Sequence, residues 1–334
     1  TPPPAGPEKG PSGMATPNID TVREISERLS NWGRWGDDDQ RGTLNFTEPE
    51  HVARAAALIK AGRTISMALP YDDAGPQTGS GRFNPIHLMI RDGADAVAGT
   101  AVRDFYGGVD RHFAGTDDII IMPLQCGTQW DSLGHIVFEK RIYNGYSADW
   151  VTSKGALKNS VSQGAGAMAG RGVLLDVAAA KGLEWLEPGY AISGDDLDEA
   201  AAFGGVSVGQ GDHVFVRTGA ITQVRARGAW ADYAGGDAAG LGLASADWLA
   251  DNRIAAVATD TWGFEVRPNE TPDVYQPMHI VVIVHMGLWV GEIFDLDPLA
   301  RDCSADGTYE FFFCGPPLPF TRAVGSPLNP MAIK

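Results

Sequence analysis

Apolar positions recur along the chain at two spacings, the 3.6-residue period of a helix and the two-residue period of a strand. Helical spacing predicts helices over residues 19–29, 49–60, 193–203 and 245–252. The last three start beside a residue that can cap a helix, namely Thr47, Ser193 and Ser245. Strands are predicted over residues 64–69, 85–89, 173–177, 211–219 and 254–259. Helices and strands that alternate in this way indicate an α/β domain.

A continuous apolar run, residues 119–124, predicts the end of a buried strand. Residues 92–118 before it are rich in Gly and Asp, and we expect them to form a loop. The pattern shows no internal repeat and no linker between folding units, so one domain is expected over residues 18–334. Residues 1–17 are rich in Pro and Gly and lack an apolar segment, which predicts a disordered leader rather than a signal peptide.

Composition and charge narrow the class of protein. A chain of 334 residues with 44% apolar content can bury a large core. The net charge of −16 argues against a nucleic-acid partner, which requires a basic face. No apolar stretch reaches the length of about 18 residues that a membrane span needs. The three cysteines are too few and too scattered for a disulfide framework, so we expect a reducing, cytoplasmic location.

The segment that follows the apolar run concentrates side chains able to do chemistry. In an extended chain, residues an even number apart share a face, so Gln125, Gln129 and Asp131 are expected to project to one side. His135 follows after a glycine that lets the backbone turn. Three oxygen-bearing side chains that converge beyond a strand can hold a cation or a substrate amide.

A second group of such side chains lies near the C-terminus. His279 precedes the apolar run 280–284, and Glu292 closes the segment 13 residues after His279. Glutamate is rarely buried unless it is paired. Glu292 therefore either reaches solvent at the end of its element or takes part in the chemistry.

The spacing in the first segment resembles the signature of the cyclase family of metal-dependent hydrolases, which includes bacterial kynurenine formamidase and isatin hydrolase. The family pattern H-x-G-T-H-x-D-x-P-x-H stands here as Q-C-G-T-Q-W-D-S-L-G-H. The Gly-Thr pair, Asp131 and His135 match. Gln125 and Gln129 replace two histidines that ligate metal in those relatives, and a leucine replaces the proline.

The resemblance extends over roughly residues 30–332 and includes the second group. There Gly287 and Glu292 match the family pattern, whereas His279 lies one position early and Ile293 replaces an asparagine. The resemblance implies a swivelling β/β/α fold with a mixed central sheet and flanking helices. It also implies a homodimer or a homotetramer.

The resemblance further implies that Gln125, Gln129 and Asp131 hold a divalent cation, and that His135 and Glu292 move protons. His279 and Glu292 are candidates for a second metal site. Substrate-binding candidates are Trp130, Tyr143, Trp262 and His279.

Amide oxygens are hard, neutral ligands that suit manganese, magnesium or calcium better than zinc, so Mn²⁺ is expected in preference to Zn²⁺. A site without metal is the alternative, with Gln125 and Gln129 holding the substrate carbonyl through hydrogen bonds. The expected function is hydrolysis of a cyclic amide, imide or lactone, or of an N-acyl amide, in a small aromatic or bicyclic substrate. Two alternatives stay open, a metal-independent lyase, dehydratase or ring-closing cyclase, and a non-catalytic small-molecule binding protein.

Overall fold

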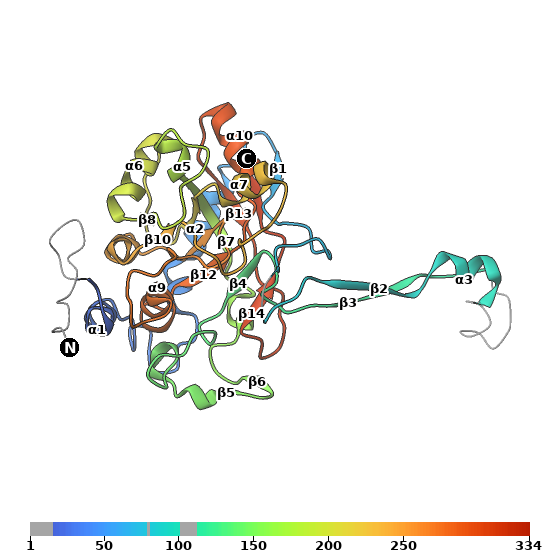
Figure 1. The fold of residues 1–334 in the computed structure, drawn as a ribbon, viewed down its shortest axis with the longest axis horizontal. Helices are drawn as coiled ribbons and strands as arrows, with labels where there is room; N and C mark the ends of the chain where they lie inside the picture. Colours follow the sequence, from blue (N-terminus) through green and yellow to red (C-terminus); the bar gives the residue numbers. More distant parts are fainter. Residues whose placement is uncertain (1–15, 79–80, 101–111) are drawn as a thin grey trace, which may run out of the picture.

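A nine-stranded mixed sheet runs through the body of the molecule (Figure 1). The structure is a computed structural model, and it describes residues 16–78, 81–100 and 112–334. The order of the strands across the sheet is β1-β15-β13-β7-β9-β11-β12-β4-β14. Their bounds are β1 Thr64–Ser66, β4 Gln129–Asp131, β7 Ala169–Asp176, β9 His213–Arg217, β11 Ala256–Thr259, β12 Trp289–Glu292, β13 Glu310–Cys314, β14 Gly325–Pro327 and β15 Met331–Ile333.

The centre of the sheet is parallel and its flanks are antiparallel. Strands β7, β9, β11 and β12 run parallel, and the strands added on either side run antiparallel to their neighbours. Strands β9 and β11 are buried along their whole length, as expected for strands covered on both faces. This mixed sheet with flanking helices confirms the predicted α/β fold class.

Helices cover the sheet and one another. Helix α2 packs on β7 and β13, α6 packs on β7 and α5, and α1 packs against a π-helix at Ile280–His285. The helices are α1 Ile19–Arg28, α2 Pro49–Ala56, α3 Gly93–Ala98, α5 Val177–Ala180, α6 Gly194–Gly204, α7 Ala220–Arg227, α8 Ala246–Asp251, α9 Pro277–His279 and α10 Asp297–Asp306. Among the described residues, three strand pairs lie outside the main sheet: β2 Ile86–Arg91 with β3 Asp117–Ile121, β5 Val151–Thr152 with β6 Gly155–Ala156, and β8 Ala191–Ile192 with β10 Gly240–Leu241.

Helix α2 differs from its prediction at both ends. It ends at Ala56, and the residue before its first turn is Glu48 rather than Thr47. The Glu48 backbone N–H donates to Nδ1 of His51 at 3.0 Å, which satisfies one of the free donors of the first turn. The Thr47 hydroxyl instead donates to the Gly211 carbonyl, a partner that is distant in the sequence. The predicted cap at Ser193 is confirmed.

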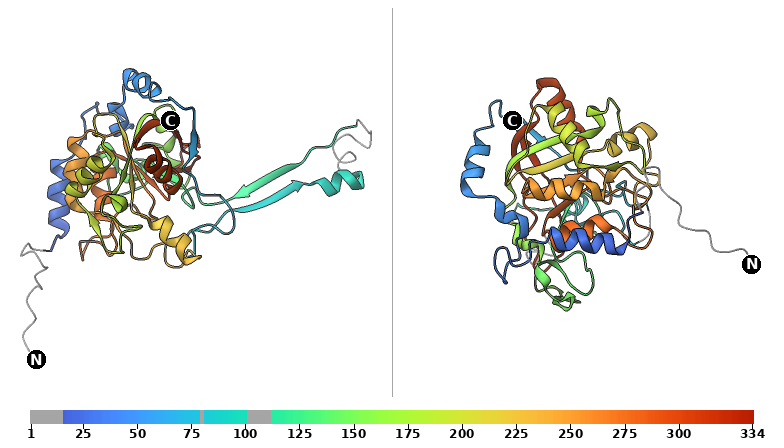
Figure 2. Two further views of the ribbon diagram at one scale, coloured as in Figure 1. Left: turned by 90° about the horizontal axis from the view of Figure 1, so that it is seen from above. Right: turned by 90° about the vertical axis from the view of Figure 1, so that its left-hand side faces the viewer.

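The apolar run 119–124 is not a buried strand, and this prediction is wrong. Strand β3 Asp117–Ile121 pairs antiparallel with β2 Ile86–Arg91, and the two form an arm that projects far from the body (Figures 1 and 2). Every residue of β3 is exposed. Part of the predicted loop 92–118 is helix α3 on this arm. Apolar content alone does not distinguish a strand buried in the core from a strand whose apolar side chains are exposed.

The predicted leader, residues 1–17, lies almost wholly outside the described residues and stays a prediction. Within the described part of the chain, helices of the length and apolar character that a membrane crossing requires do not occur.

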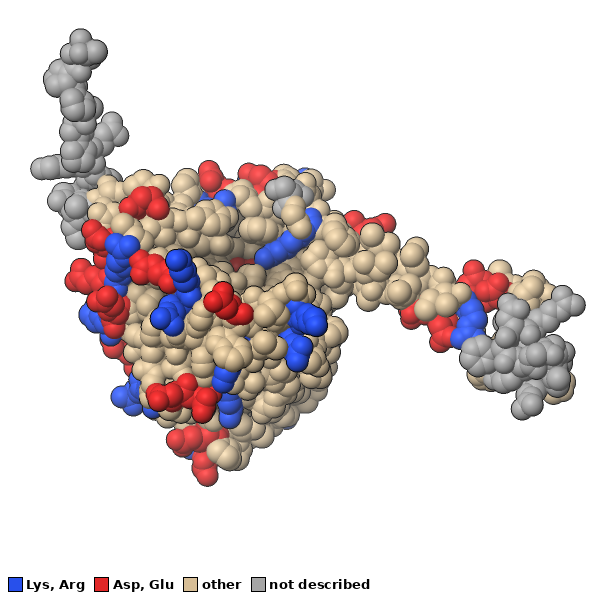
Figure 3. Space-filling view, turned by 90° about the horizontal axis from the view of Figure 1, so that it is seen from below, with Lys and Arg blue, Asp and Glu red and all other residues tan. Residues whose placement is uncertain are grey.

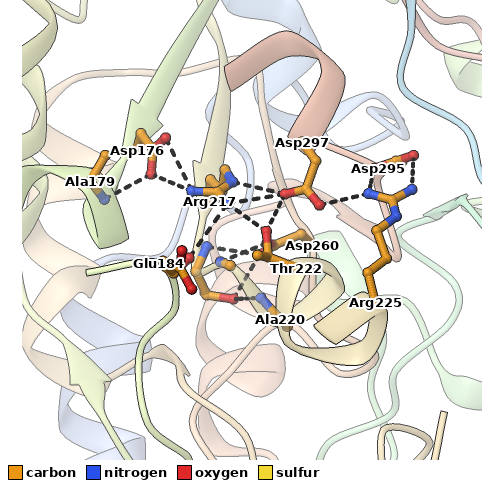
Figure 4. Close-up of polar contacts among 12 residues, drawn as sticks. Asp176, Ala179, Glu184, Arg217, Ala220, Thr222, Arg225, Asp260, Asp295 and Asp297 are labelled. Atoms are coloured by element: carbon orange, nitrogen blue, oxygen red, sulfur yellow. Dashed lines mark hydrogen bonds and ion pairs between the residues drawn. The ribbon is translucent and has the colours of Figure 1, made fainter. Parts of the chain in front are cut away.

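A buried charge network closes the carboxyl ends of the parallel strands (Figure 4). Arg217, which ends β9, donates to Asp176 of β7 at 3.0 Å and to Asp297 of α10 at 3.1 Å. Asp260, which follows β11, accepts from the Thr218 N–H and hydroxyl and from the Gly219 N–H, all at 2.7–2.8 Å. These bonds fix the loop that leads from β11 to the candidate site.

Removing the Arg217 guanidinium should therefore destabilise the fold. We expect Arg217→Leu to lower the free energy of unfolding by about 3–5 kcal/mol, because it leaves the buried Asp176 without its cation and removes one of the two arginines that pair with Asp297. Urea denaturation followed by circular dichroism measures the loss. The matched control is Arg227→Leu, which removes an exposed pair with Asp232 and should cost less than about 1 kcal/mol. Equal losses in the two variants would contradict a structural role for the network.

Candidate functional site

The candidate site is built where two antiparallel strands, β4 and β12, lie side by side. Gln129 and Asp131 alternate with Trp130 along β4, so both project from the same face of the sheet. Glu292 of β12 is the register partner of Gln129, and the Gln129 amide donates to Glu292 Oε2 at 2.7 Å. Two side chains that are 163 positions apart in the sequence therefore meet at one point.

The Gly-Thr pair before β4 explains how the sequence positions this strand. A Cβ on Gly127 would lie 2.8 Å from the ring of Tyr71, so the backbone approaches that ring only because position 127 is glycine. The Thr128 hydroxyl, fully buried, donates to the Ile293 carbonyl at 2.6 Å. Ile293 holds a φ of 59°, a strained conformation for a β-branched residue, immediately after Glu292.

His279, the last residue of helix α9, also lies at this point. Its Nε2 lies 3.2 Å from Glu292 Oε1, and its Nδ1 lies 2.5 Å from Glu265 Oε1. The carboxylate of Glu265 also accepts the backbone N–H groups of Met278 and His279. Glu265 therefore fixes both the helix end and the orientation of the imidazole ring, as outer carboxylates do for metal-binding histidines.

Three half-buried side chains, His135, Gln125 and Trp262, lie around the buried cluster. His135 Nε2 lies 3.8 Å from Asp131 Oδ1, and the His135 side chain is 21% exposed. The Gln125 amide packs over Gly325. Gly325 pairs with Asp131 across the sheet, so Gln125 lies at the edge of the cluster, on the same face of the sheet as Asp131. The Trp262 ring packs under the guanidinium of Arg82, which in turn donates to the Gln125 carbonyl.

Burial and neighbouring charges shift the protonation of two residues. Burial, with a smaller contribution from the charge of Glu292, raises the pKa of Asp131 to about 6. Burial alone would lower the pKa of His279, but hydrogen bonds to Glu265 and Glu292 outweigh it and raise that pKa to about 10. His279 is thus a cation held between two carboxylates, and it must release its Nε2 proton before that nitrogen can coordinate a metal.

The donor set fits a hard divalent cation. Asp131, His279 and Glu292 each place one ligand atom within 4.8 Å of the others. Within the described part of the chain, Gln129 Oε1 and both carboxylate oxygens of Asp131 are buried without a hydrogen-bond partner. Buried oxygens are rarely left unpaired. A cation bound by these four residues would satisfy all three oxygens, and a carboxylate- and amide-rich set favours manganese or magnesium over zinc.

The structure brings together five of the residues expected from the sequence, Gln129, Asp131, His135, His279 and Glu292, with Gln125 at the rim. Two expected substrate-binding residues lie elsewhere. Trp130 projects from the opposite face of β4, where it is fully buried and donates to the Gly315 carbonyl. Tyr143 is fully buried with its hydroxyl donating to Asp39. Both aromatics belong to the core rather than to the substrate pocket.

Glu265 and Arg82 belong to the site and were not expected from the sequence. Glu265 lies in a stretch without regular periodicity, 14 residues before His279. Arg82 lies at the base of the arm and donates to the Gln125 carbonyl at 3.0 Å. No local pattern marks either residue, because each is placed by contacts with segments distant in the sequence.

Comparison with known proteins supports the resemblance seen in the sequence. A family model named Cyclase, described as "Putative cyclase", matches residues 46–266. A crystal structure described as that of a novel cyclase is similar to this chain, with a TM-score of 0.81 and 37% identity over 92% of this chain and 100% of that one. A search of curated proteins found no match.

Two isatin hydrolases share the fold at low identity. Isatin hydrolase A from Ralstonia solanacearum has a TM-score of 0.58 and 15% identity, and the match covers 86% of this chain and 97% of that one. Isatin hydrolase A from Labrenzia aggregata, bound to benzyl benzoate, has a TM-score of 0.56 and 16% identity over 83% and 94% of the two chains.

The cost of burying Asp131 can be measured in protein treated with a chelator. Because the folded pKa of Asp131 is raised, the folded state holds its proton more tightly than the unfolded state, so stability falls as the pH rises from about 4 to about 6. We expect Asp131→Asn to raise the free energy of unfolding at pH 8 by on the order of 2 kcal/mol. The gain should disappear below pH ~4. Denaturation at both pH values checks this, and a loss of stability at pH 8 would contradict it.

Proposed function

Since this chain belongs to the cyclase family, we propose that it is a hydrolase that uses activated water to open a cyclic amide, imide or lactone, or to cleave an N-acyl amide. The observation that carries the proposal is a buried carboxylate, Asp131, neither oxygen of which accepts a hydrogen bond from the described residues, beside His135, His279 and Glu292. A fold maintained only for stability would pair that carboxylate or replace it.

The proposed metal ligands are Gln129 Oε1, the carboxylates of Asp131 and Glu292, and Nε2 of His279, with Mn²⁺ preferred over Zn²⁺. These residues would hold a divalent cation, whose chemistry there would be to polarise the scissile carbonyl and to lower the pKa of a bound water toward neutrality. Glu265 keeps the His279 ring turned toward the ligand position by accepting its Nδ1–H. The Gln129 amide holds Glu292 in place through Oε2.

His135 is the proposed general base. Both carboxylate oxygens of Glu292 are engaged, one by Gln129 and one by His279, so Glu292 is suited to ligation rather than to proton transfer. His135 lies beside Asp131 and is partly open to solvent. It can take a proton from the attacking water and return it to the leaving nitrogen or oxygen.

An aromatic ring and a cation beside the site favour a flat substrate that becomes an anion on hydrolysis. The Trp262 indole N–H donates to Gln77 at 3.2 Å, which fixes the orientation of the ring. The Arg82 guanidinium stacks on that ring and lies close enough to lower the pKa of Asp131. A carboxylate product would be attracted to this cation.

Two variants separate the role of the base from that of the ligand. We expect His135→Gln to lower kcat on a hydrolysed substrate by about 10²–10⁴-fold while Mn²⁺ affinity stays within a few-fold, because proton transfer alone is lost. We expect Glu292→Gln to lower both turnover and Mn²⁺ affinity, because a ligand is lost. Substrates are found by screening cyclic amides, imides, lactones and N-formyl amides for carboxylate release, and calorimetry measures the metal. Glu310→Gln on β13 is the matched control. Full activity in both site variants would reject the proposal.

Metal selectivity tests the identity of the ligands without any substrate. We expect Gln129→His to raise Zn²⁺ affinity at least about tenfold relative to Mn²⁺, because an imidazole replaces a hard amide oxygen. Competition with a chromophoric chelator measures both affinities. Gln210→His, on an exposed loop, controls for adventitious binding to a new imidazole. An unchanged ratio of the two affinities would show that position 129 does not face the metal.

A further inference from the structure

Two residues from a segment distant in the sequence close the end of the π-helix that follows α9. The last backbone carbonyls of a helix lack partners within it, and buried carbonyls normally find a partner elsewhere. Asn31 donates its backbone N–H to the His285 carbonyl at 2.9 Å and its side-chain amide to the Met286 carbonyl at 2.8 Å. The Trp32 indole N–H donates to the Val284 carbonyl at 2.7 Å. Two adjacent residues thus satisfy three successive carbonyls, and we call them the π-helix cap.

The ring of Trp32 adds a stacking contact to this cap. It lies nearly parallel to the His285 imidazole, with ring centroids 5.0 Å apart and planes 6° apart. Burial lowers the pKa of His285 to about 4, so the stacked imidazole is neutral near pH 7. Trp32 also packs closely over Gly145, where a Cβ would lie 3.2 Å from the ring. These contacts fix the direction of the indole N–H.

Helix α1 brings the cap to the π-helix. It ends three residues before Asn31, and it packs on the π-helix with an inner face that includes the buried Val22. Its outer face carries the exposed charges Asp20, Arg23 and Glu24. Both signs of charge are likewise interspersed over the face of the body drawn in Figure 3. The outer face of α1 is thus an ordinary solvated surface, and the apolar packing of this helix is directed inward.

The π-helix connects two parts of the candidate site. His279 immediately precedes it, and after it the chain turns back into β12, which ends with Glu292. Nε2 of His279 and Oε1 of Glu292 lie 3.2 Å apart. In the turn between helix and strand, the Gly287 carbonyl accepts the Thr43 N–H at 2.9 Å. The position of His279 relative to Glu292 therefore depends on how the intervening helix is wound.

The winding of this helix is an uncommon one. A π-helix is hydrogen-bonded between residues five apart, is rare, and is found frequently at functional sites. The Met286 N–H donates to the Val281 carbonyl at 3.0 Å, which is this spacing. Rewinding to an α-helix, with about 100° per residue, would shift the register by one residue and turn His279 away from Glu292. The bonds from the cap oppose that change, because they fix the carbonyls at the end of the helix.

We propose that Asn31 and Trp32 are positioning residues, which keep the π-helix wound so that Nε2 of His279 faces Glu292. Each acts through carbonyls of the helix rather than through contact with the cation. The inference rests on the proposed role of His279 and Glu292 as metal ligands. Residues that orient metal ligands typically change metal affinity by about 10–100-fold when they are replaced.

A matched pair of asparagine variants separates positioning from simple stabilisation. Asn31→Ala removes a side-chain bond of 2.8 Å to a carbonyl at the end of the π-helix. Asn252→Ala removes one of 2.9 Å at the end of α8, which contributes no residue to the candidate site. Both variants should lower the urea midpoint of unfolding to a similar extent. Only Asn31→Ala should also weaken Mn²⁺ binding, by about tenfold in calorimetry.

A matched pair of tryptophan variants tests the other half of the cap. Trp32→Phe keeps an aromatic ring beside His285 but removes the bond of 2.7 Å to the Val284 carbonyl. Trp248→Phe removes an indole bond of the same length, to Asp198. Mn²⁺ affinity should fall by about tenfold in Trp32→Phe and stay within about twofold in Trp248→Phe. Near-ultraviolet circular dichroism verifies that every variant keeps its core.

The ring of His279 gives a readout that needs no bound metal. NMR of chelator-treated protein that contains isotope-labelled histidine reports on the ring nitrogens, which lie 2.5 Å from Glu265 and 3.2 Å from Glu292. The His279 signals, assigned by their loss in His279→Gln, should shift in Asn31→Ala and in Trp32→Phe. They should stay unchanged in the two control variants.

The two readouts distinguish failure of this inference from failure of the proposed function. Mn²⁺ affinity and His279 signals that match the wild type in both cap variants would overturn the inference while the proposed metal site stands. Equal changes in the cap variants and their controls would also overturn it. If the wild-type chain binds no Mn²⁺, the proposed metal site is wrong and the His279 signals decide. A shift confined to the cap variants would then support positioning, and no shift would overturn it.

Discussion

The antiparallel pairing of β4 with β12 is the constraint on which the site depends. It sets Gln129 opposite Glu292 and places Asp131 on the same face, while Trp130 between them anchors the strand in the core. A slip of one residue in this register would turn the aspartate into the core and the indole into the site. The hydrogen bond of the Thr128 hydroxyl to the Ile293 carbonyl opposes such a slip, and it is formed at a strained residue.

Two buried aspartates show how the same residue serves different purposes. Burial raises the pKa of both Asp131 and Asp260 to about 6. Asp260 accepts three hydrogen bonds from the backbone and side chain of Thr218 and from Gly219, so its charge is compensated and it holds a loop. Asp131 accepts none within the described residues, so its charge is available to a ligand. The absence of hydrogen bonds to the Asp131 carboxylate, in contrast to the three that Asp260 accepts, is what identifies Asp131 as a functional candidate.

The glutamines of the signature change the chemistry without dismantling the site. Gln129 keeps an oxygen directed at the position that a cation would take. Its NH₂ group donates a hydrogen bond to Glu292. His279 supplies the imidazole, and Glu265 orients it. A set of two carboxylates, one amide oxygen and one imidazole is harder than a set rich in histidine. The family fold is thus retained, and the proposed ligand set is one that suits a hard cation.

Helices α1, α2, α6 and α8, the α/β class and the choice of Asp131, His135 and Glu292 as site candidates followed from the sequence, because local periodicity and the spacing of a signature carry that information. The tertiary structure alone decided three further matters. It added Glu265 and Arg82, removed Trp130 and Tyr143 from the pocket, and placed an apolar strand on an exposed arm. Each depends on strand register or on contacts between segments distant in the chain, and hydrophobicity along a sequence does not specify which surface will cover an apolar residue.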